Sequence, residues 1–143
     1  MTAALGIVES PNEKLVRSFL AAMGRTDIES LSDLLAEDAT WWLAGELPVS
    51  GLYEGKAAIV GEFLPSAAAL FEQGSLGFEL RNVMSDGEAI IAEYVGTGTG
   101  TSQRPYHNQY CTIFQCHGGK IRSIREYLDT AHVYGALYPA ISE

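Results

Sequence analysis

Apolar side chains recur at the spacing of two helices near the start of the chain. Ser10-Pro11-Asn12-Glu13 has the composition of a helix start, with a serine cap and a proline at the first helical position. Apolar residues then recur every three or four positions up to Gly24, which predicts an amphipathic helix that ends there. Thr26-Asp27 begins a second, shorter helix, and Glu37-Asp38 ends it.

The next stretch predicts a strand, a loop and a long helix. Residues 39–44 are almost entirely apolar and include two tryptophans, which is typical of a strand. Residues 45–55 contain glycines and a proline, which favour a loop. Residues 56–71 carry apolar side chains at helical spacing, and Pro65 is expected to kink this helix or to split it in two.

The second half of the chain alternates between apolar and polar residues. Four strands are predicted, over residues 76–84, 88–101, 106–116 and 121–129. Glycine turns at Ser85-Asp86-Gly87 and Gly118-Gly119 join the first two and the last two strands as hairpins. The tail beyond residue 129 is expected to form a short helix or a cover. Helices followed by hairpins indicate an α+β fold, and the length indicates one domain over residues 1–143.

The last predicted strand carries candidate chemistry. Alternation places Arg125, Tyr127 and Asp129 on one face of this strand. The opposite face carries a mixed set of packing residues: Ile124, Glu126 and Leu128. A carboxylate, a phenol and a guanidinium in one row could form a reaction site or a solvated edge, and the strand alone leaves both open.

Composition narrows the classes of partner and location. Apolar residues make up 47% and charged residues 19%, as in a globular protein. The net charge is −9 and no basic block occurs, so we expect neither nucleic acid nor a membrane surface as a partner. The chain shows neither a membrane span nor a secretory signal, which predicts a cytoplasmic protein. Cys111 and Cys116, roughly 16 Å apart if extended, are expected to be reduced, buried thiols.

Four stretches carry a resemblance to a known family. They are residues 34–41 (LLAEDATW), 51–59 (GLYEGKAAI), 106–110 (YHNQY) and 119–129 (GKIRSIREYLD). Over nearly the whole chain the sequence resembles the NTF2-like superfamily and, within it, the SnoaL-like and ketosteroid-isomerase-like family. The resemblance implies a cone-shaped α+β fold, in which a curved antiparallel sheet wraps on a long helix with two N-terminal helices. It also implies an apolar pocket inside the cone and a homodimer formed through the outer sheet face.

The family includes isomerases and cyclases of carbonyl compounds, limonene-type epoxide hydrolases and small binding proteins, so the reaction must be argued from the site. The two acids of ketosteroid isomerase correspond to Leu43 or a neighbouring residue and to Tyr110 or Cys111 here, so a literal ketosteroid isomerase is not expected. Epoxide hydrolases carry an Arg and an Asp on a middle strand, where this chain has Tyr94 and Gly96.

Asp129 resembles the acid near the end of the last strand on which the polyketide-cyclase branch depends, and the epoxide hydrolases have an acid there too. Its carboxyl group would abstract a proton beside a carbonyl and return one, which works best when apolar surroundings raise the pKa. Tyr127 or His132 could then donate to the developing enolate oxygen. Equally, Asp129 could simply end the strand and cap the turn at Thr130.

Six residues are expected to contact a ligand in the cone: Trp41, Trp42, Tyr53, Asn108, Tyr110 and Arg125. The two tryptophans point to opposite faces of their strand, so only one of them should face the pocket. Asn108 and Tyr110 share a strand face that we expect to point inward. Arg125 also has a structural interpretation, as an ion-pair or dimer-face residue.

The sequence therefore predicts a SnoaL-like protein that holds a small apolar carbonyl compound. The first hypothesis is isomerase or cyclase chemistry without a cofactor, with Asp129 as acid and base. An epoxide hydrolase variant and a binding or accessory protein without turnover are the alternatives. No metal is expected, because the chain has no His-Glu-x-x-His or Cys-x-x-Cys motif.

Overall fold

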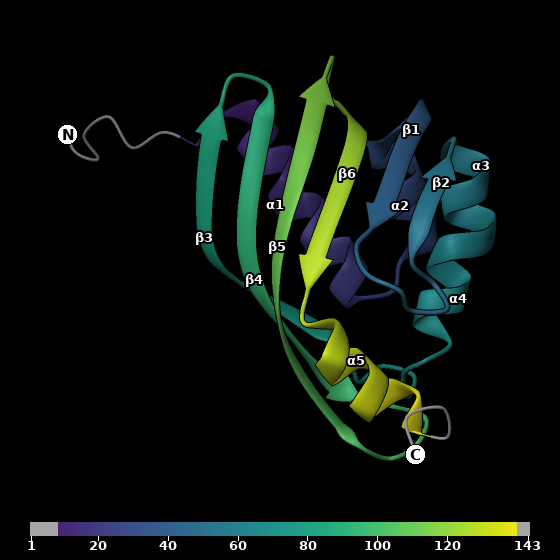
Figure 1. Cartoon of the computed structure of the whole chain (residues 1–143). Coiled ribbons are helices and arrows are strands. Elements are labelled where there is room, and N and C mark those ends of the chain that lie inside the picture. The colour runs from purple at the N-terminus through teal and green to yellow at the C-terminus, as the bar shows by residue number, and fades with distance from the viewer. Residues whose placement is uncertain (1–8, 140–143) are drawn as a thin grey trace.

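A computed structural model describes residues 9–139 and confirms the α+β class (Figure 1). The helical segments are α1 (Pro11–Gly24), α2 (Ile28–Leu34), the consecutive α3 (Lys56–Ala58), η1 (Ile59–Phe63) and α4 (Leu64–Ala68), and α5 (Thr130–Leu137). The strands are β1 (Leu35–Leu43), β2 (Gly51–Glu54), β3 (Gly77–Asp86), β4 (Ala89–Thr99), β5 (Pro105–His117) and β6 (Lys120–Leu128). Together the strands form one curved sheet in the order β2-β1-β6-β5-β4-β3.

The sheet is antiparallel, as predicted, except where β1 and β6 pair in parallel. Parallel neighbours require a long crossover, and here most of the chain lies between the two strands. The segment predicted as a loop over residues 45–55 contains the short strand β2, which pairs with β1 so that Leu52 lies opposite Trp42. The parallel contact therefore joins the first predicted strand to the last one.

The start of α1 follows the predicted capping pattern. Ser10 Oγ accepts a hydrogen bond from the backbone N–H of Glu13 at 3.1 Å, and Glu13 Oε1 accepts one from the backbone N–H of Ser10 at 3.0 Å. This reciprocal pair satisfies two N–H groups that the first turn of a helix leaves free. Asp27 caps α2 in a similar way, by accepting from the backbone N–H of Ser30 at 3.1 Å.

Pro65 does not split the long helix in two, because the helical segments run without a break from Lys56 to Ala68. The helix contains a π-helical turn, η1, immediately before the segment α4 that includes Pro65. Proline has no N–H to donate, and its ring clashes with the carbonyl group four residues earlier, which here belongs to Gly61 within η1. The wider turn accommodates the proline without ending the helix.

Aromatic side chains join the helices to the inner face of the sheet. Phe19 of α1 lies 5.8 Å from Trp41 of β1 and 5.9 Å from Phe114 of β5, measured between ring centroids. Phe63 of η1 lies 4.7 Å from Trp41. Because both helices contact the Trp41 ring, they cover the same face of the sheet. Figure 1 shows α5 at the end of the sheet where β6 finishes.

Two further sequence expectations can be compared with the structure. Cys111 and Cys116 are free thiols, as predicted; Cys116 is buried and Cys111 is half-buried. None of the helices within residues 9–139 is long and apolar enough to cross a membrane.

Candidate active site

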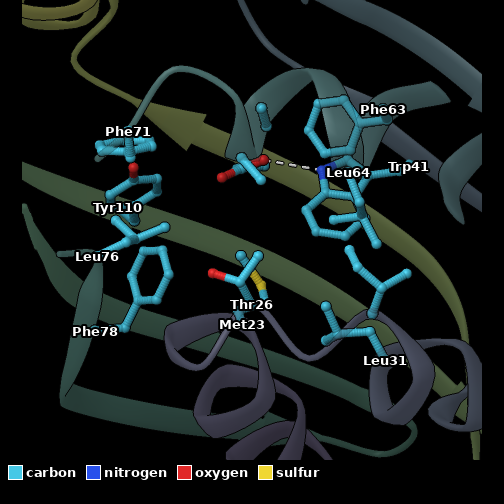
Figure 2. Close-up of a pocket in the computed structure, with 14 residues that line it drawn as sticks. Met23, Thr26, Leu31, Trp41, Phe63, Leu64, Phe71, Leu76, Phe78 and Tyr110 are labelled. Carbon is cyan, nitrogen blue, oxygen red and sulfur yellow. Dashed lines mark hydrogen bonds between the residues drawn. The ribbon is translucent and has the colours of Figure 1, made fainter. Parts of the chain in front are cut away.

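The inner face of the sheet and the helices enclose two adjoining chambers. The larger has a volume of about 90 Å³ and is bounded by α1, α2, η1, α4 and the sheet. The smaller, of about 60 Å³, extends toward α5. The two chambers have five lining residues in common: Phe63, Ala67, Phe71, Tyr110 and Glu126. Figure 2 shows the larger chamber surrounded by aromatic and aliphatic side chains.

The size of the chambers limits what they can hold. A dry apolar cavity of roughly 150 Å³ accommodates benzene. Neither chamber, at about 90 and about 60 Å³, reaches this volume by itself, so one small ring fits only if it occupies both chambers across the residues that they share. A fused ring system would require the walls to move.

Glu126 is a carboxyl group inside this apolar space. Along β6, Ile124 and Glu126 are buried whereas Arg125 and Tyr127 are exposed. The parallel pairing of β1 with β6 brings Trp41 beside Glu126, and Trp41 Nε1 donates to Glu126 Oε1 at 2.9 Å, the bond drawn as a dashed line in Figure 2. No other donor within residues 9–139 bonds this carboxyl group, so Oε2 is the atom available to a ligand.

Burial changes the acidity of this group. Loss of hydration raises the pKa of Glu126 to about 7, and the hydrogen bond from Trp41 opposes this by a smaller amount. A carboxyl group whose pKa lies near neutrality can both take and return a proton at physiological pH. Glu126 therefore has the properties that the sequence analysis expected of Asp129.

Three polar side chains on the inner face of β5 form a hydrogen-bonded row that ends at the chambers. Asn108 Oδ1 accepts from the backbone N–H of Gln109 at 2.8 Å, and Asn108 Nδ2 donates to Tyr106 Oη at 2.9 Å. Tyr106 Oη lies 2.6 Å from Tyr110 Oη. Burial raises the pKa of Tyr106 to about 12 and that of Tyr110 well above its ordinary value. Both groups are therefore neutral hydroxyls that can donate.

Gly96 on β4 leaves the space that the Tyr110 ring occupies. Tyr110 stacks on Tyr94 with ring centroids 4.9 Å apart. A Cβ atom at position 96 would lie 2.8 Å from the Tyr110 ring and 2.9 Å from the Phe78 ring, closer than real Cβ contacts allow. Tyr94 Oη is itself paired with Thr112 Oγ1 at 2.7 Å. The two positions that correspond to the Arg and Asp of epoxide hydrolases thus hold packing residues in this chain.

Asp129 lies outside the cone. β6 ends at Leu128, and Asp129 caps α5, where its Oδ1 accepts from the backbone N–H of His132 at 3.2 Å. Its side chain is exposed and lines neither chamber. The expected placement of this carboxyl group in an apolar funnel is therefore wrong. It continues the strand face of Arg125 and Tyr127, and that face is the outer one.

Tyr127 and His132 also lie away from the chambers. Tyr127 is exposed on the outer sheet face, with its ring 5.3 Å from that of Trp42. His132 Nε2 accepts from the backbone N–H of His107 at 3.1 Å, and its ring lies 5.2 Å from that of Tyr106. Neither residue lines a chamber. The three residues predicted as catalytic are not brought together around the pocket.

Of the six residues predicted to contact a ligand, Trp41 and Tyr110 line the larger chamber. Asn108 is buried on the inner face, as predicted, but it bonds Tyr106 and lines neither chamber. The Tyr53 ring lies 4.8 Å from that of Phe63 and its hydroxyl donates to a backbone carbonyl, so it supports the wall of the chamber. The remaining two lie on the outer face of the sheet: Trp42 and Arg125.

The sequence reasoning did not identify Glu126 as functional, although a signal was present. It is an acid flanked on its own strand face by two apolar residues, Ile124 and Leu128. A carboxyl group on such a face is buried unless the strand turns outward, and burial of a carboxyl group is uncommon without a partner or a role. An acid that breaks an apolar alternation is therefore a better indicator than an acid at a strand end.

The polar groups at the chambers define the available chemistry. Within residues 9–139, the lining contributes one carboxyl group, from Glu126, and hydroxyl groups from Thr26, Tyr106 and Tyr110. No three His, Cys, Asp or Glu side chains in this part of the chain come close enough to hold a metal ion. The arrangement can move a proton and can donate a hydrogen bond to an oxygen atom.

The chain is similar to SnoaL-like domains over residues 16–124. Among solved structures, an NTF2-like protein from Burkholderia xenovorans LB400 is 29% identical, with 92% of this chain and 99% of that chain covered and a TM-score of 0.72. A proposed isomerase from Bacillus subtilis is 25% identical, with 88% and 91% covered and a TM-score of 0.78. A proposed SnoaL-like polyketide cyclase from Jannaschia sp. CCS1 is 15% identical, with 92% and 94% covered and a TM-score of 0.76, which shows a shared fold alone. No functionally curated protein matches the sequence.

Proposed function

Because the chain belongs to the SnoaL-like domain family, as its sequence predicted, we propose that it binds a small carbonyl compound in its cone and acts on it without a cofactor. We assign Glu126 as the acid and base. One observation carries this assignment: a carboxyl group with a pKa of about 7 lies in an apolar chamber with one oxygen available. The proposed isomerase, which is 25% identical, supports the reaction class.

The proposed reaction begins with proton transfer from carbon to Glu126. The carboxylate Oε2 takes a proton from the carbon next to the carbonyl group, and the electron pair of that C–H bond forms the carbon–carbon double bond of an enolate. The negative charge moves to the carbonyl oxygen. In a substrate with a carbon–carbon double bond beyond the α-carbon, the charge also reaches the far carbon of that bond, and Glu126 returns its proton there, which completes an isomerisation. In a substrate with a second carbonyl group, the enolate carbon attacks the second carbonyl carbon, the C=O π bond breaks, and Glu126 gives its proton to the alkoxide oxygen that forms, which completes a cyclisation.

Tyr110 is the group that we assign to the enolate oxygen. Its hydroxyl group lies at the end of the row that begins at Asn108, and Tyr110 lines both chambers together with Glu126. Asn108 donates to Tyr106, which leaves the Tyr106 proton free to point to Tyr110. The Tyr110 proton can then point into the chamber. Hydrogen-bond donors fixed where charge develops stabilise a transition state because they need no reorganisation.

The proposed substrate is a compact ketone or aldehyde. The chambers match one small ring, and their walls are apolar apart from the carboxyl and hydroxyl groups. A cyclic ketone of about seven heavy atoms fits this description. A steroid does not, unless the walls open.

Proton exchange in heavy water tests the proposal. The wild-type protein is expected to exchange the α-protons of cyclohexanone for deuterium faster than buffer does, as followed by proton NMR. Glu126→Gln is isosteric and keeps an acceptor for Trp41, so it should fold while losing about 10²–10⁴-fold in exchange rate. The matched control is Asp129→Asn, which should exchange at the wild-type rate.

Three results would contradict the proposal. Retained exchange in Glu126→Gln would remove Glu126 from the role, and loss of exchange in Asp129→Asn alone would return the role to the carboxyl group that the sequence indicated. If the wild type binds the ketone without exchanging its protons, a binding or accessory function replaces catalysis.

We also propose that two copies pair through the outer sheet face. Trp42 and Tyr127 pack together there, and Leu52, opposite Trp42 on β2, has 56% of its surface exposed. Exposed apolar clusters of this kind mark interfaces. Light scattering after size-exclusion chromatography should give a dimer mass, and Tyr127→Glu should reduce it to that of a monomer. A monomeric wild type would contradict the pairing.

The cytoplasmic location stays a prediction.

A further inference from the structure

The carboxyl group in the cone has no cationic partner. Within residues 9–139, no Lys, Arg or His lines either chamber. Glu126 is 5% exposed and accepts one hydrogen bond, from Trp41 at Oε1. Its Oε2 receives none from the described residues. A buried carboxylate is costly unless it is paired with a positive charge and hydrogen-bonded. A bound cation that carries an N–H group would supply both interactions.

The walls around Glu126 are suited to a cation. Aromatic rings from β1, η1, the segment after α4, β3 and β5 surround the larger chamber, as Figure 2 shows: Trp41, Phe63, Phe71, Phe78 and Tyr110. The faces of aromatic rings attract ammonium groups, and the attraction grows when water is excluded. Aliphatic side chains, such as Leu64 and Leu31, complete the walls and can contact a hydrocarbon group.

We propose that the cone is a binding site for small alkylammonium ions, in which the ammonium group donates to Glu126 Oε2 and its hydrocarbon part contacts the aromatic rings. The fitting ligand is an amine on a compact hydrocarbon no larger than one six-membered ring. This binding function requires no turnover and stands apart from the proposed reaction. Such amines would also compete with a ketone for the same chambers.

Binding depends on the charge of Glu126. The other titratable groups that face it are Tyr106 and Tyr110 of β5 and Tyr94 of β4, and burial raises the pKa of each of these hydroxyls, so they stay neutral. The described lining residues from α1, α2, η1 and α4 contribute no titratable group. Glu126, with its pKa of about 7, is therefore the group that titrates, and amine affinity should rise as the pH increases through 7.

Cyclohexylamine and cyclohexanol form a matched pair of probes, because both carry one six-membered ring and only the first is a cation at neutral pH. Isothermal titration of the full chain at pH 5.5 and 8.5 measures both affinities. Cyclohexylamine should bind roughly 30-fold more tightly at pH 8.5, because a carboxyl group with a pKa of about 7 changes from mostly protonated to mostly ionised. Cyclohexanol should show no such increase.

Two variants complete the test. Glu126→Gln should weaken cyclohexylamine binding at pH 8.5 by roughly tenfold or more and should leave cyclohexanol binding unchanged, which shows that the chamber is intact. Asp129→Asn should behave as the wild type. The inference is overturned if cyclohexylamine does not bind, binds equally at both pH values, or binds equally to Glu126→Gln. Failure of ketone exchange does not affect it, because exchange tests catalysis and these titrations test recognition of a cation.

Discussion

Glu126 and Asp129 are two acids at the same end of β6, and their surroundings are opposite. Glu126 lies on the inner face among aromatic rings, and burial raises its pKa to about 7. Asp129 lies past the end of the strand, exposed, and accepts a hydrogen bond from the first turn of α5. The first group is suited to proton transfer and the second to holding a helix end. The difference shows that the strand face, rather than the position along the strand, determines the chemistry of an acid.

The largest expected difference between the two acids is in the pH dependence of stability. The pKa of Glu126 is 4.5 in its ordinary state and about 7 in the folded protein, so the folded state keeps a proton that the unfolded chain releases. This proton stabilises the folded state fully below pH 4.5, and the stabilisation is lost as the pH rises through 7. The free energy of unfolding should therefore fall by about 3 kcal/mol. Urea unfolding between pH 4.5 and 8.5 should show this fall in the wild type and in Asp129→Asn, but not in Glu126→Gln. Equal curves for the wild type and Glu126→Gln would contradict the burial of this carboxyl group.

A second comparison is between two glycine positions, one packed against the Tyr110 ring and one in α5 with open space around it. Gly96→Ala places a methyl group 2.8 Å from the Tyr110 ring, so we expect a loss of about 2 kcal/mol in unfolding free energy. Gly135→Ala in α5 has open space around its Cβ and should stabilise the protein by about 0.5 kcal/mol. Thermal and urea unfolding measure both variants. If the two substitutions had the same effect, the close packing behind Tyr110 would be disproved.

A smaller effect is expected from the tyrosine row. Tyr106→Phe removes the hydroxyl group between Asn108 and Tyr110 and with it two hydrogen bonds. Loss of the bond that orients the Tyr110 hydroxyl should lower the ketone exchange rate by about tenfold. The matched control is Tyr127→Phe on the outer face, which should leave the rate unchanged. An equal decrease in both variants would show that the row has no special role.

The smallest effect concerns the helix cap. Asp129→Ala should reduce the unfolding free energy by about 1 kcal/mol, because the backbone N–H of His132 loses its acceptor. Asp129→Asn retains a capping oxygen and should be nearly neutral. Neither variant should change the exchange rate, and a change in either one would argue for a second role of Asp129.

Local signals in the sequence predicted much of the fold. Ser10 and Glu13 mark the start of α1, and alternation places Arg125 and Glu126 on opposite faces of β6. These features depend on residues close in sequence, so periodicity and capping rules detect them.

The parts of the site that the sequence did not predict depend on distant contacts. Trp41 and Glu126 are 85 residues apart, and only the parallel pairing of β1 with β6 brings them together. Alternation divides the side chains of β6 into two sets, but it does not tell which set faces the helices. The resemblance to a family acid directed attention to Asp129, whereas the structure buries the face of Ile124 and Glu126.

The titration of Glu126 itself is the most direct measurement. Carbon NMR of protein labelled at the glutamate carboxyl carbons, recorded from pH 3 to 9, assigns the signal by its absence in Glu126→Gln. The burial of this group in the apolar chamber predicts a midpoint near pH 7. A midpoint near the ordinary value of 4.5 would mean that water reaches the carboxyl group, and the assignment of Glu126 as acid and base would then be wrong.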